Sequence, residues 1–350
     1  MEAPQRRHVL QWHITHLCNL RCVHCYQEEY ARHMDEDMMG RVLEKYERYL
    51  KLLDLPGQIN LTGGEPLLHP KFFDLARSIR SHGHRLAVLT NGTLIDGETA
   101  AGLAALKPVF VQVSLDGTRA AYDRIRGEGN FDRALQGIDR LKEQGVKVLV
   151  SFTAQKGNRE ELPGLAQVCR EHKVDKLWWD RVVTASPEET ERLALGTEEF
   201  LALVKTGNAL RQQGFPVDNS RALQFCGDLS CGGYRCSAGG DLLIVLADGS
   251  LMPCRRLPFV AGHIDDGEIA PVLAKDPEMR RLRLARVPAF CRSCRDLFRC
   301  FGGAKCVTYA QTGRWDRPDV NCPYLAERED PFGERSAKDS GMSRKNEHSV

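Results

Sequence analysis

Residues 16–25 read HLCNLRCVHC and place three cysteines, Cys18, Cys22 and Cys25, within eight residues. Three thiolates on one short loop can hold a cubane iron–sulfur cluster and leave its fourth iron without a protein ligand. An open iron is a position at which a substrate can chelate. A zinc ion completed by a neighbouring histidine is the alternative, since thiolates also suit zinc. This loop therefore predicts a metal site close to the start of the chain.

The chain around this loop alternates short apolar runs with amphipathic stretches. The runs typical of strands are 9–15, 58–62, 85–90, 109–114, 147–153 and 176–183. The helical stretches between and after them are 37–53, 70–82, 97–106, 130–144 and 159–172. Six strand–helix units in a row predict an α/β fold with a parallel sheet and helices outside it. Periodicity alone leaves open whether this sheet closes into a barrel.

The distinctive residues all follow the carboxyl ends of predicted strands. The cysteine loop follows the first strand, and Gly63-Gly64-Glu65-Pro66 follows the second. Asn91-Gly92 follows the third strand, and Ser114 and Asp116 lie at the end of the fourth. In parallel α/β folds the chemistry gathers at this rim. Glycine pairs also form ordinary turns, and a loop aspartate often only caps a helix. Because four loops converge with the cysteines, we expect one functional site there.

Composition excludes several classes of protein. The 350 residues carry 49 basic and 47 acidic side chains, a net charge of +2, which does not favour a nucleic-acid or membrane surface. The longest apolar runs, 110–115 and 242–247, are too short to span a bilayer, and residues 1–14 lack the apolar block of a signal peptide. We therefore expect a cytoplasmic protein, where its 13 cysteines stay reduced and indicate metal binding rather than disulfides.

The cysteines divide the chain into two parts. After the N-terminal triplet, only Cys169 occurs before a cysteine-dense region that begins at Cys226. We expect a first domain over residues 1–215, a second over 216–330, and a polar, disordered tail over 331–350. Cys169 lies in a helical pattern and is expected to be a small buried hydrophobe.

The triplet spacing followed by Gly-Gly-Glu-Pro resembles the radical S-adenosylmethionine (SAM) superfamily over about residues 8–210. The resemblance implies a partial (β/α)6 TIM-like barrel and a 4Fe–4S cluster on the three cysteines, with SAM bound to its open iron. It also implies that Gly63, Gly64 and Glu65 hold the methionyl amine. Ser114 and Asp116 match positions that contact the ribose or the carboxylate. Tyr26 is expected to pack near the adenine of SAM. The alternative is that its ring packs only against other side chains of the protein.

The cysteine-rich region resembles the SPASM domain over about residues 226–325. The resemblance implies two auxiliary 4Fe–4S clusters. One would be held by Cys231, Cys236, Cys254 and Cys306, the other by Cys291, Cys294, Cys300 and Cys322. The usual C-x3-C step is C-x5-C here, which makes the Cys306 ligand a departure from the pattern. Two structural zinc ions in the same eight thiols are the alternative.

Two further features bear on the reaction. Cys226 either replaces Cys231 as a ligand or is a catalytic thiol that donates a hydrogen atom to a substrate radical. Arg255 and Arg256, with the charged segment 122–127, either grip an acidic substrate or form a solvated basic face. Sulfatase-maturing relatives carry an acidic residue, which acts as a base, directly after the cysteine that matches Cys254. This chain has Arg255 there, which disfavours a sulfatase-maturing activity.

The resemblance therefore predicts an oxidoreductase, a peptide-modifying maturase that forms a 5′-deoxyadenosyl radical and abstracts hydrogen from a ribosomally synthesised peptide or a protein. Crosslinking, epimerisation and side-chain oxidation are the expected outcomes. The alternatives are action on a small molecule such as a tetrapyrrole side chain, and a non-catalytic iron–sulfur scaffold or electron-transfer protein. The expected partners are an electron donor such as flavodoxin or ferredoxin and, since the chain starts almost on its first strand, a separate peptide-recognition protein or the barrel surface itself.

Overall fold

The structure is a computed structural model, and it describes residues 6–27, 29–218, 236–284 and 287–325. The predicted hydrogen donor Cys226, the predicted ligand Cys231 and the predicted tail 331–350 lie outside the described residues.

The described residues form a ten-stranded sheet in the order β10-β9-β8-β1-β2-β3-β4-β5-β6-β7. All pairs from β8 through β1 to β7 are parallel. The first seven strands are β1 (His8–His13), β2 (Gly57–Thr62), β3 (Arg85–Thr90), β4 (Phe110–Ser114), β5 (Val148–Ala154), β6 (Lys176–Arg181) and β7 (Val217–Asp218). The six strands expected from the sequence are thereby confirmed. Since β7 and β10 end the sheet at opposite edges, the barrel is partial.

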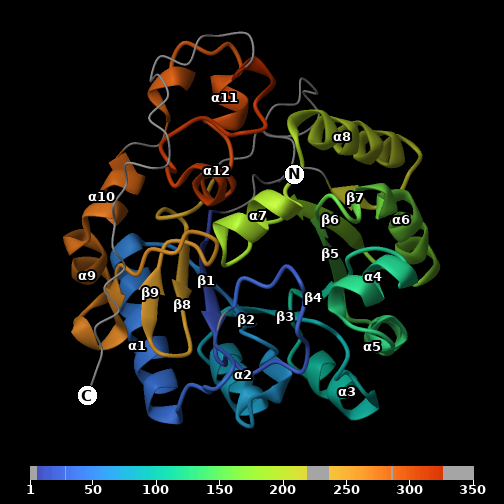
Figure 1. Ribbon diagram of the computed structural model, residues 1–350. Helices are drawn as coiled ribbons and strands as arrows, with labels where there is room; N and C mark the ends of the chain where they lie inside the picture. Colours follow the sequence, from blue (N-terminus) through green and yellow to red (C-terminus); the bar gives the residue numbers. More distant parts are fainter. Residues whose placement is uncertain (1–5, 28, 219–235, 285–286, 326–350) are drawn as a thin grey trace.

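Helices surround the outside of the curved sheet (Figure 1). The predicted ones are α1 (Glu36–Leu53), α2 (Phe72–Ser81), α3 (Gly97–Ala105), α5 (Asn130–Glu143) and α6 (Leu162–Glu171). Further helices, not expected from the sequence, are α4 (Arg119–Arg126), α7 (Pro187–Leu193) and α8 (Thr197–Gln212).

The longest of these, α1, shows why the sequence folds this way. The Asp35 carboxylate accepts a hydrogen bond from the Met38 backbone N–H and caps the first turn. Val42 and Tyr46, four residues apart, bury one helix face in the core. The apolar spacing read from the sequence therefore corresponds to real contact between helix and sheet.

The C-terminal part adds strands to the same sheet. β8 (Leu242–Val245) lies parallel to β1, and β9 (Ser250–Met252) and β10 (Gly262–His263) follow antiparallel. Beyond them come α9 (Ile269–Lys275), α10 (Pro277–Leu284), α11 (Leu297–Cys300) and α12 (Lys305–Thr312). The sheet therefore runs across the expected border at residues 215–216, with β7 at one edge and β8 beside β1.

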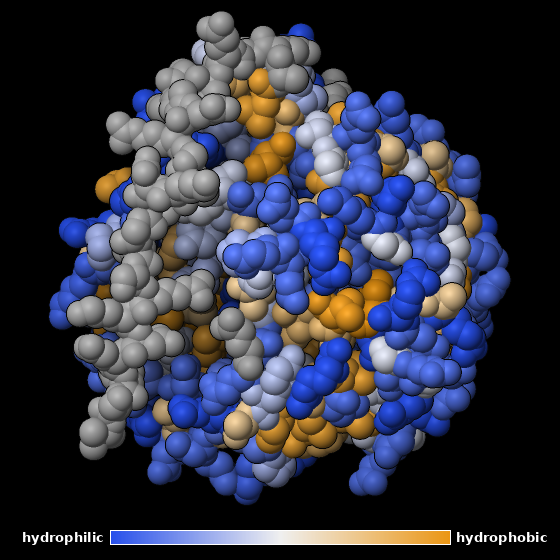
Figure 2. Space-filling view, in the orientation of Figure 1, coloured by the Kyte–Doolittle hydropathy of each residue, from blue (hydrophilic) through white to orange (hydrophobic). Residues whose placement is uncertain are grey.

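The surface is mainly polar. The face shown in Figure 2 is mostly hydrophilic, with apolar side chains gathered in small areas between charged ones. Large apolar side chains that stay exposed are scattered along the chain: Val23, Leu52, Val260, Leu284 and Phe298. In the part of the chain that the structure describes, no helix combines the length and apolar character needed to cross a membrane.

Candidate active site

A cavity of about 640 Å³ lies at the centre of the curved sheet. Residues from every strand between β1 and β8 line it, which fits the rim expected from the sequence. The cysteine triplet borders it from the β1 side. Its lining also includes the predicted site residues Tyr26, Gly63, Gly64 and Ser114.

Each sulfur of the triplet has an N–H donor. The Leu20 backbone donates to Cys18 Sγ at 3.4 Å, and the Gln27 backbone donates to Cys25 Sγ at 3.4 Å. Arg126 Nη1 donates to Cys22 Sγ at 3.6 Å. Donors of this kind stabilise thiolates and tune iron–sulfur clusters. The donor set, three thiols on one loop that all line one cavity, therefore fits an iron–sulfur cluster that these three cysteines would hold.

Gly63 and Gly64 hold the cysteine loop against the end of β2. Gly64 N donates to Thr15 O and Glu65 N donates to Leu17 O, both at 2.8 Å. A Cβ on either glycine would lie 2.3 Å from a backbone oxygen of that loop, of Thr15 for Gly63 and of Leu17 for Gly64. The glycines are therefore required for this close backbone contact, in addition to lining the cavity.

Glu65 is fully buried, and its carboxylate is held by protein donors. Oε1 accepts from Thr90 Oγ1 at 2.7 Å and from Leu67 N at 3.2 Å, and Oε2 accepts from Asn91 N at 2.8 Å. Burial raises the pKa of this carboxyl to about 7. These contacts favour a positioning role that joins the loops after β2 and β3. A direct contact between Glu65 and the methionyl amine stays a prediction.

Asp116 is also fully buried, and it positions a cation at the cavity. Its Oδ2 accepts from Arg126 Nε at 2.6 Å and its Oδ1 accepts from Thr153 N at 2.8 Å. Arg126 lines the cavity, whereas the Asp116 carboxylate is enclosed by its donors. Burial opposes the charge of Arg126, but Asp116 raises its pKa above the ordinary value. Sequence reasoning noted the segment 122–127 only as charge, and it missed this buried pair.

Tyr26 and Arg255 form one wall of the cavity. The Arg255 guanidinium lies 4.9 Å from the centre of the Tyr26 ring, and its Nη2 donates to Tyr26 O at 3.1 Å. The ring is thus fixed by a cation–π contact beside the third cysteine of the triplet. Contact between Tyr26 and an adenine stays a prediction.

A second set of cysteines borders the same cavity. Cys236, Cys254 and Cys306 all line it together with the triplet. Burial raises the pKa of the Cys306 thiol, and the neighbouring Cys254 and Cys236 raise it further. The three described members of the first predicted auxiliary set therefore come together, while the fourth, Cys231, lies outside the described residues.

The unusual C-x5-C step reaches this site through a left-handed turn. Phe301, Gly302 and Gly303 have φ values of 50°, 88° and 87°. Glycine adopts such values readily. A Cβ on Gly303 would lie 2.2 Å from Asp319 Cβ, so the turn packs tightly on that residue. The longer step thus still delivers Cys306 to the cavity.

The other predicted auxiliary set gathers around a separate small cavity. Cys291, Cys294, Cys300 and Cys322 line it with Asp296 and Asp319. Burial, and then the neighbouring Cys300, Cys322 and Cys294, together raise the pKa of the Cys291 thiol to about 12. The four thiols proposed as one ligand set are therefore neighbours in the fold. Cys169, in contrast, is fully buried in α6 within the core, as predicted.

Comparison with known protein families matches both parts of the chain. Residues 12–167 match the family described as the Radical SAM superfamily, and residues 236–295 match SPASM, an iron–sulfur cluster-binding domain. The second match begins at Cys236, and of the four cysteines around the separate cavity it covers two, Cys291 and Cys294.

Individual relatives differ in how much of the chain they match. The Fe-coproporphyrin III synthase of Methanosarcina barkeri is 32% identical over 222 residues, which are 62% of this chain and 55% of that protein. This chain thus spans about half of that relative's length. The mycofactocin maturase MftC of Mycobacterium tuberculosis is 29% identical over 339 residues, 89% of this chain and 82% of its own.

A solved structure shares the fold. Streptococcus suis SuiB bound to its precursor peptide SuiA superimposes with a TM-score of 0.72 at 17% identity. The match covers 91% of this chain and 76% of SuiB.

Proposed function

Since this chain is a radical SAM protein with a C-terminal SPASM domain, we propose that it is an oxidoreductase that abstracts a hydrogen atom from a peptide or protein. Its cofactors are SAM, a 4Fe–4S cluster that binds it, and auxiliary iron–sulfur clusters. When bound, these groups supply the one-electron cleavage of SAM to methionine and a 5′-deoxyadenosyl radical. The ligands that we propose for the first cluster are Cys18, Cys22 and Cys25.

The observation that carries this proposal is the shared cavity. The cysteine triplet and the set of Cys236, Cys254 and Cys306 both line the same space of about 640 Å³. A substrate bound there would lie between the two sets. We propose that Gly63, Gly64 and Ser114 hold SAM on the triplet side, where Arg126 is a fixed cation that donates to Cys22 Sγ.

The lining of the cavity favours a peptide. Gln11, Gln58, Asn60 and Gln112 project neutral amides into it from β1, β2 and β4. The Gln112 Oε1 accepts from Trp178 Nε1 at 3.2 Å, which leaves its NH2 group to donate to a ligand. Neutral donors and acceptors of this kind match the backbone amides of a peptide. MftC, a relative named as a maturase, matches the chain over most of its length and supports the same substrate class.

The test is the mass of each short peptide encoded beside the gene, after anaerobic co-expression with this protein. A loss of two hydrogens would support crosslinking or oxidation of a side chain. An unchanged mass with one deuterium gained in heavy water would support epimerisation, and Cys226 would then be the first residue to replace. No change in any of these peptides would contradict the peptide proposal.

A tetrapyrrole side chain is the second candidate substrate. The relative named Fe-coproporphyrin III synthase is the observation that favours it. Arg255 and Lys176 also line the cavity, and such cations could pair with propionate groups. Lys176 is already paired with Asp218 at 2.7 Å, which weakens this candidate. Incubation with iron coproporphyrin III, SAM and reductant tests it, with a decrease in porphyrin mass as the supporting result.

An electron donor of the flavodoxin or ferredoxin type is the partner that this chemistry needs, and we propose that the protein works in the cytoplasm with it. A separate peptide-recognition protein is a further proposed partner. Measuring 5′-deoxyadenosine distinguishes this enzyme from a protein that only transfers electrons, because an electron-transfer protein would not form 5′-deoxyadenosine from SAM.

A further inference from the structure

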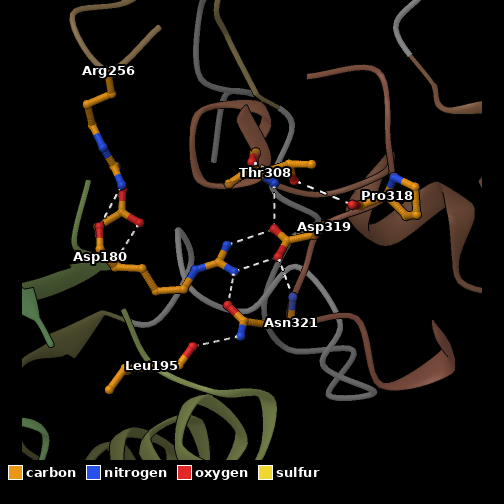
Figure 3. Close-up of polar contacts among 9 residues, drawn as sticks. Asp180, Leu195, Arg256, Thr308, Pro318, Asp319 and Asn321 are labelled. Atoms are coloured by element: carbon orange, nitrogen blue, oxygen red, sulfur yellow. Dashed lines mark hydrogen bonds and ion pairs between the residues drawn. The ribbon is translucent and has the colours of Figure 1, made fainter. Parts of the chain in front are cut away.

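Two adjacent residues of opposite charge end strand β6, and each pairs with the C-terminal part of the chain (Figure 3). Arg256 Nη1 lies 2.5 Å from Asp180 Oδ2, and Arg256 Nη2 donates to Arg181 O at 2.5 Å. The Arg256 and Asp180 side chains are only 20% and 16% exposed. The first pair therefore fixes a cation at the cavity wall.

In the second pair the charges are reversed, because the residue of β6 is the cation and the residue of the C-terminal part is the anion. Arg181 donates from Nη1 to Asp319 Oδ1 at 2.6 Å and from Nη2 to Asp319 Oδ2 at 2.8 Å. Asn321 also accepts from Arg181, and it donates to Leu195 O. The side chains of Arg181 and Asp319 are 3% and 0% exposed. Buried and bidentate, this pair has the geometry that makes an ion pair strong.

Both ion pairs anchor segments that contain cysteines lining the large cavity. Arg256 follows Cys254 by two residues. Asp319 Oδ2 accepts from Ala304 N at 2.8 Å, two residues before Cys306. Cys254 and Cys306 are therefore both tied to the end of the same barrel strand.

Arg256 lines the cavity together with Cys254 and Cys306, and its partner Asp180 lines the same wall. An arginine guanidinium stays protonated in proteins, so Arg256 is a fixed positive charge in that wall. At the other cysteine set, the two aspartates that line the cavity are themselves paired, Asp319 with Arg181 and Asp296 with Arg299.

We propose that Arg256 raises the reduction potential of the auxiliary cluster on Cys236, Cys254 and Cys306, and that Asp180 and Arg181 are the positioning residues that hold it there. The proposal rests on the proposed function, since it requires that these cysteines hold a cluster. A fixed positive charge stabilises the reduced, more negative form of a cluster, and it does so strongly in a buried site.

The test is a reductive titration of the anaerobically reconstituted full chain, followed by electron paramagnetic resonance without SAM or substrate. The variants are R256Q, R256K and D180N. Asn at position 180 keeps an oxygen that accepts from Arg256 but removes the negative charge. R314Q is the matched control, because Arg314 forms an exposed pair with Asp316 at 2.9 Å in the same region.

The proposal predicts opposite shifts of one auxiliary signal: to lower potential in R256Q and to higher potential in D180N. R256K should stay close to the wild type, and R314Q should not shift any signal. An unshifted auxiliary signal in R256Q would overturn the proposal, and so would shifts of R256Q and D180N in the same direction, which indicate loosened structure. If R256Q does not fold, an unshifted D180N overturns it equally.

Iron and sulfide analysis of the wild type separates this failure from failure of the proposed function. Fewer than three clusters would contradict the proposed function. Three clusters with unshifted potentials would overturn only the role of Arg256.

Discussion

Replacing Gly64 by alanine tests how the cysteine loop is held. The new Cβ would lie 2.3 Å from Leu17 O, 2.6 Å from Leu17 C and 2.8 Å from His16 O. These are backbone atoms, so no flexible side chain can move aside. The loop must shift by about 1 Å to restore ordinary contact at 3.4 Å. Cys18, the first proposed ligand, is the next residue and would shift with it.

The cost follows from the contacts that this shift breaks. Gly64 N to Thr15 O and Glu65 N to Leu17 O are the two hydrogen bonds between the segments, each 2.8 Å long. Losing both costs about 2 kcal/mol of unfolding free energy. A displacement of about 1 Å at a reacting centre lowers a rate by about 100-fold. We therefore expect G64A to lose about that much 5′-deoxyadenosine formation and part of its iron.

The assay compares iron content, unfolding and 5′-deoxyadenosine formation from SAM under reduction. G40A is the matched control, because Gly40 lies in α1 with nothing within 4 Å of a new Cβ. Alanine there favours the helix, so G40A should be as stable as the wild type or more so. A G64A protein with the stability, iron content and rate of the wild type would refute the steric argument.

Three further predictions concern stability. R181M leaves the Asp319 carboxylate buried without its cation and should cost about 3–5 kcal/mol in anaerobic urea unfolding, whereas R314M, at an exposed pair, should cost less than about 1 kcal/mol; equal costs would contradict the buried pairing. Burial lowers the pKa of His8 from 6.5 to about 4. The free energy of unfolding should therefore fall by about 3 kcal/mol as the pH drops from 6.5 to about 4. In a series of unfolding curves at different pH, the H8Q variant should lack this loss. C169A should cost about 1 kcal/mol without changing iron content, because Cys169 packs in the core; iron loss in C169A would show a role that the fold does not indicate.

Local patterns sufficed for much of the fold and for the placement of the cysteines. The six strands and the helices after most of them follow from apolar periodicity. The opposite directions of Trp178 and Trp179 follow from strand geometry: Trp179 is fully buried, and Trp178 lines the cavity. The cysteines that the spacing and the family resemblance group together also line common cavities, the triplet one and the set of four the other, and their roles as ligands stay predictions.

Contacts between distant residues were beyond these patterns. The pairing of β8 with β1 joins segments more than two hundred residues apart, and no local feature of 242–245 marks it. The predicted alternatives for Arg256, a substrate grip or a solvated face, both miss its half-buried pair with Asp180. The carboxylate of Asp116 accepts a hydrogen bond from Arg126, a pairing that the sequence does not indicate, while its contact with the cofactor stays a prediction. Charge partners depend on tertiary packing, so a single sequence does not specify them.

We propose that Cys18, Cys22 and Cys25 hold the cluster at which SAM is cleaved. The most direct measurement is 5′-deoxyadenosine formed from SAM by the reduced, anaerobically reconstituted wild type and by a variant with all three cysteines replaced by alanine. We predict product from the wild type and none from the variant, which should keep the iron of the auxiliary clusters. No product from fully loaded wild type, or equal product from both proteins, would contradict the claim.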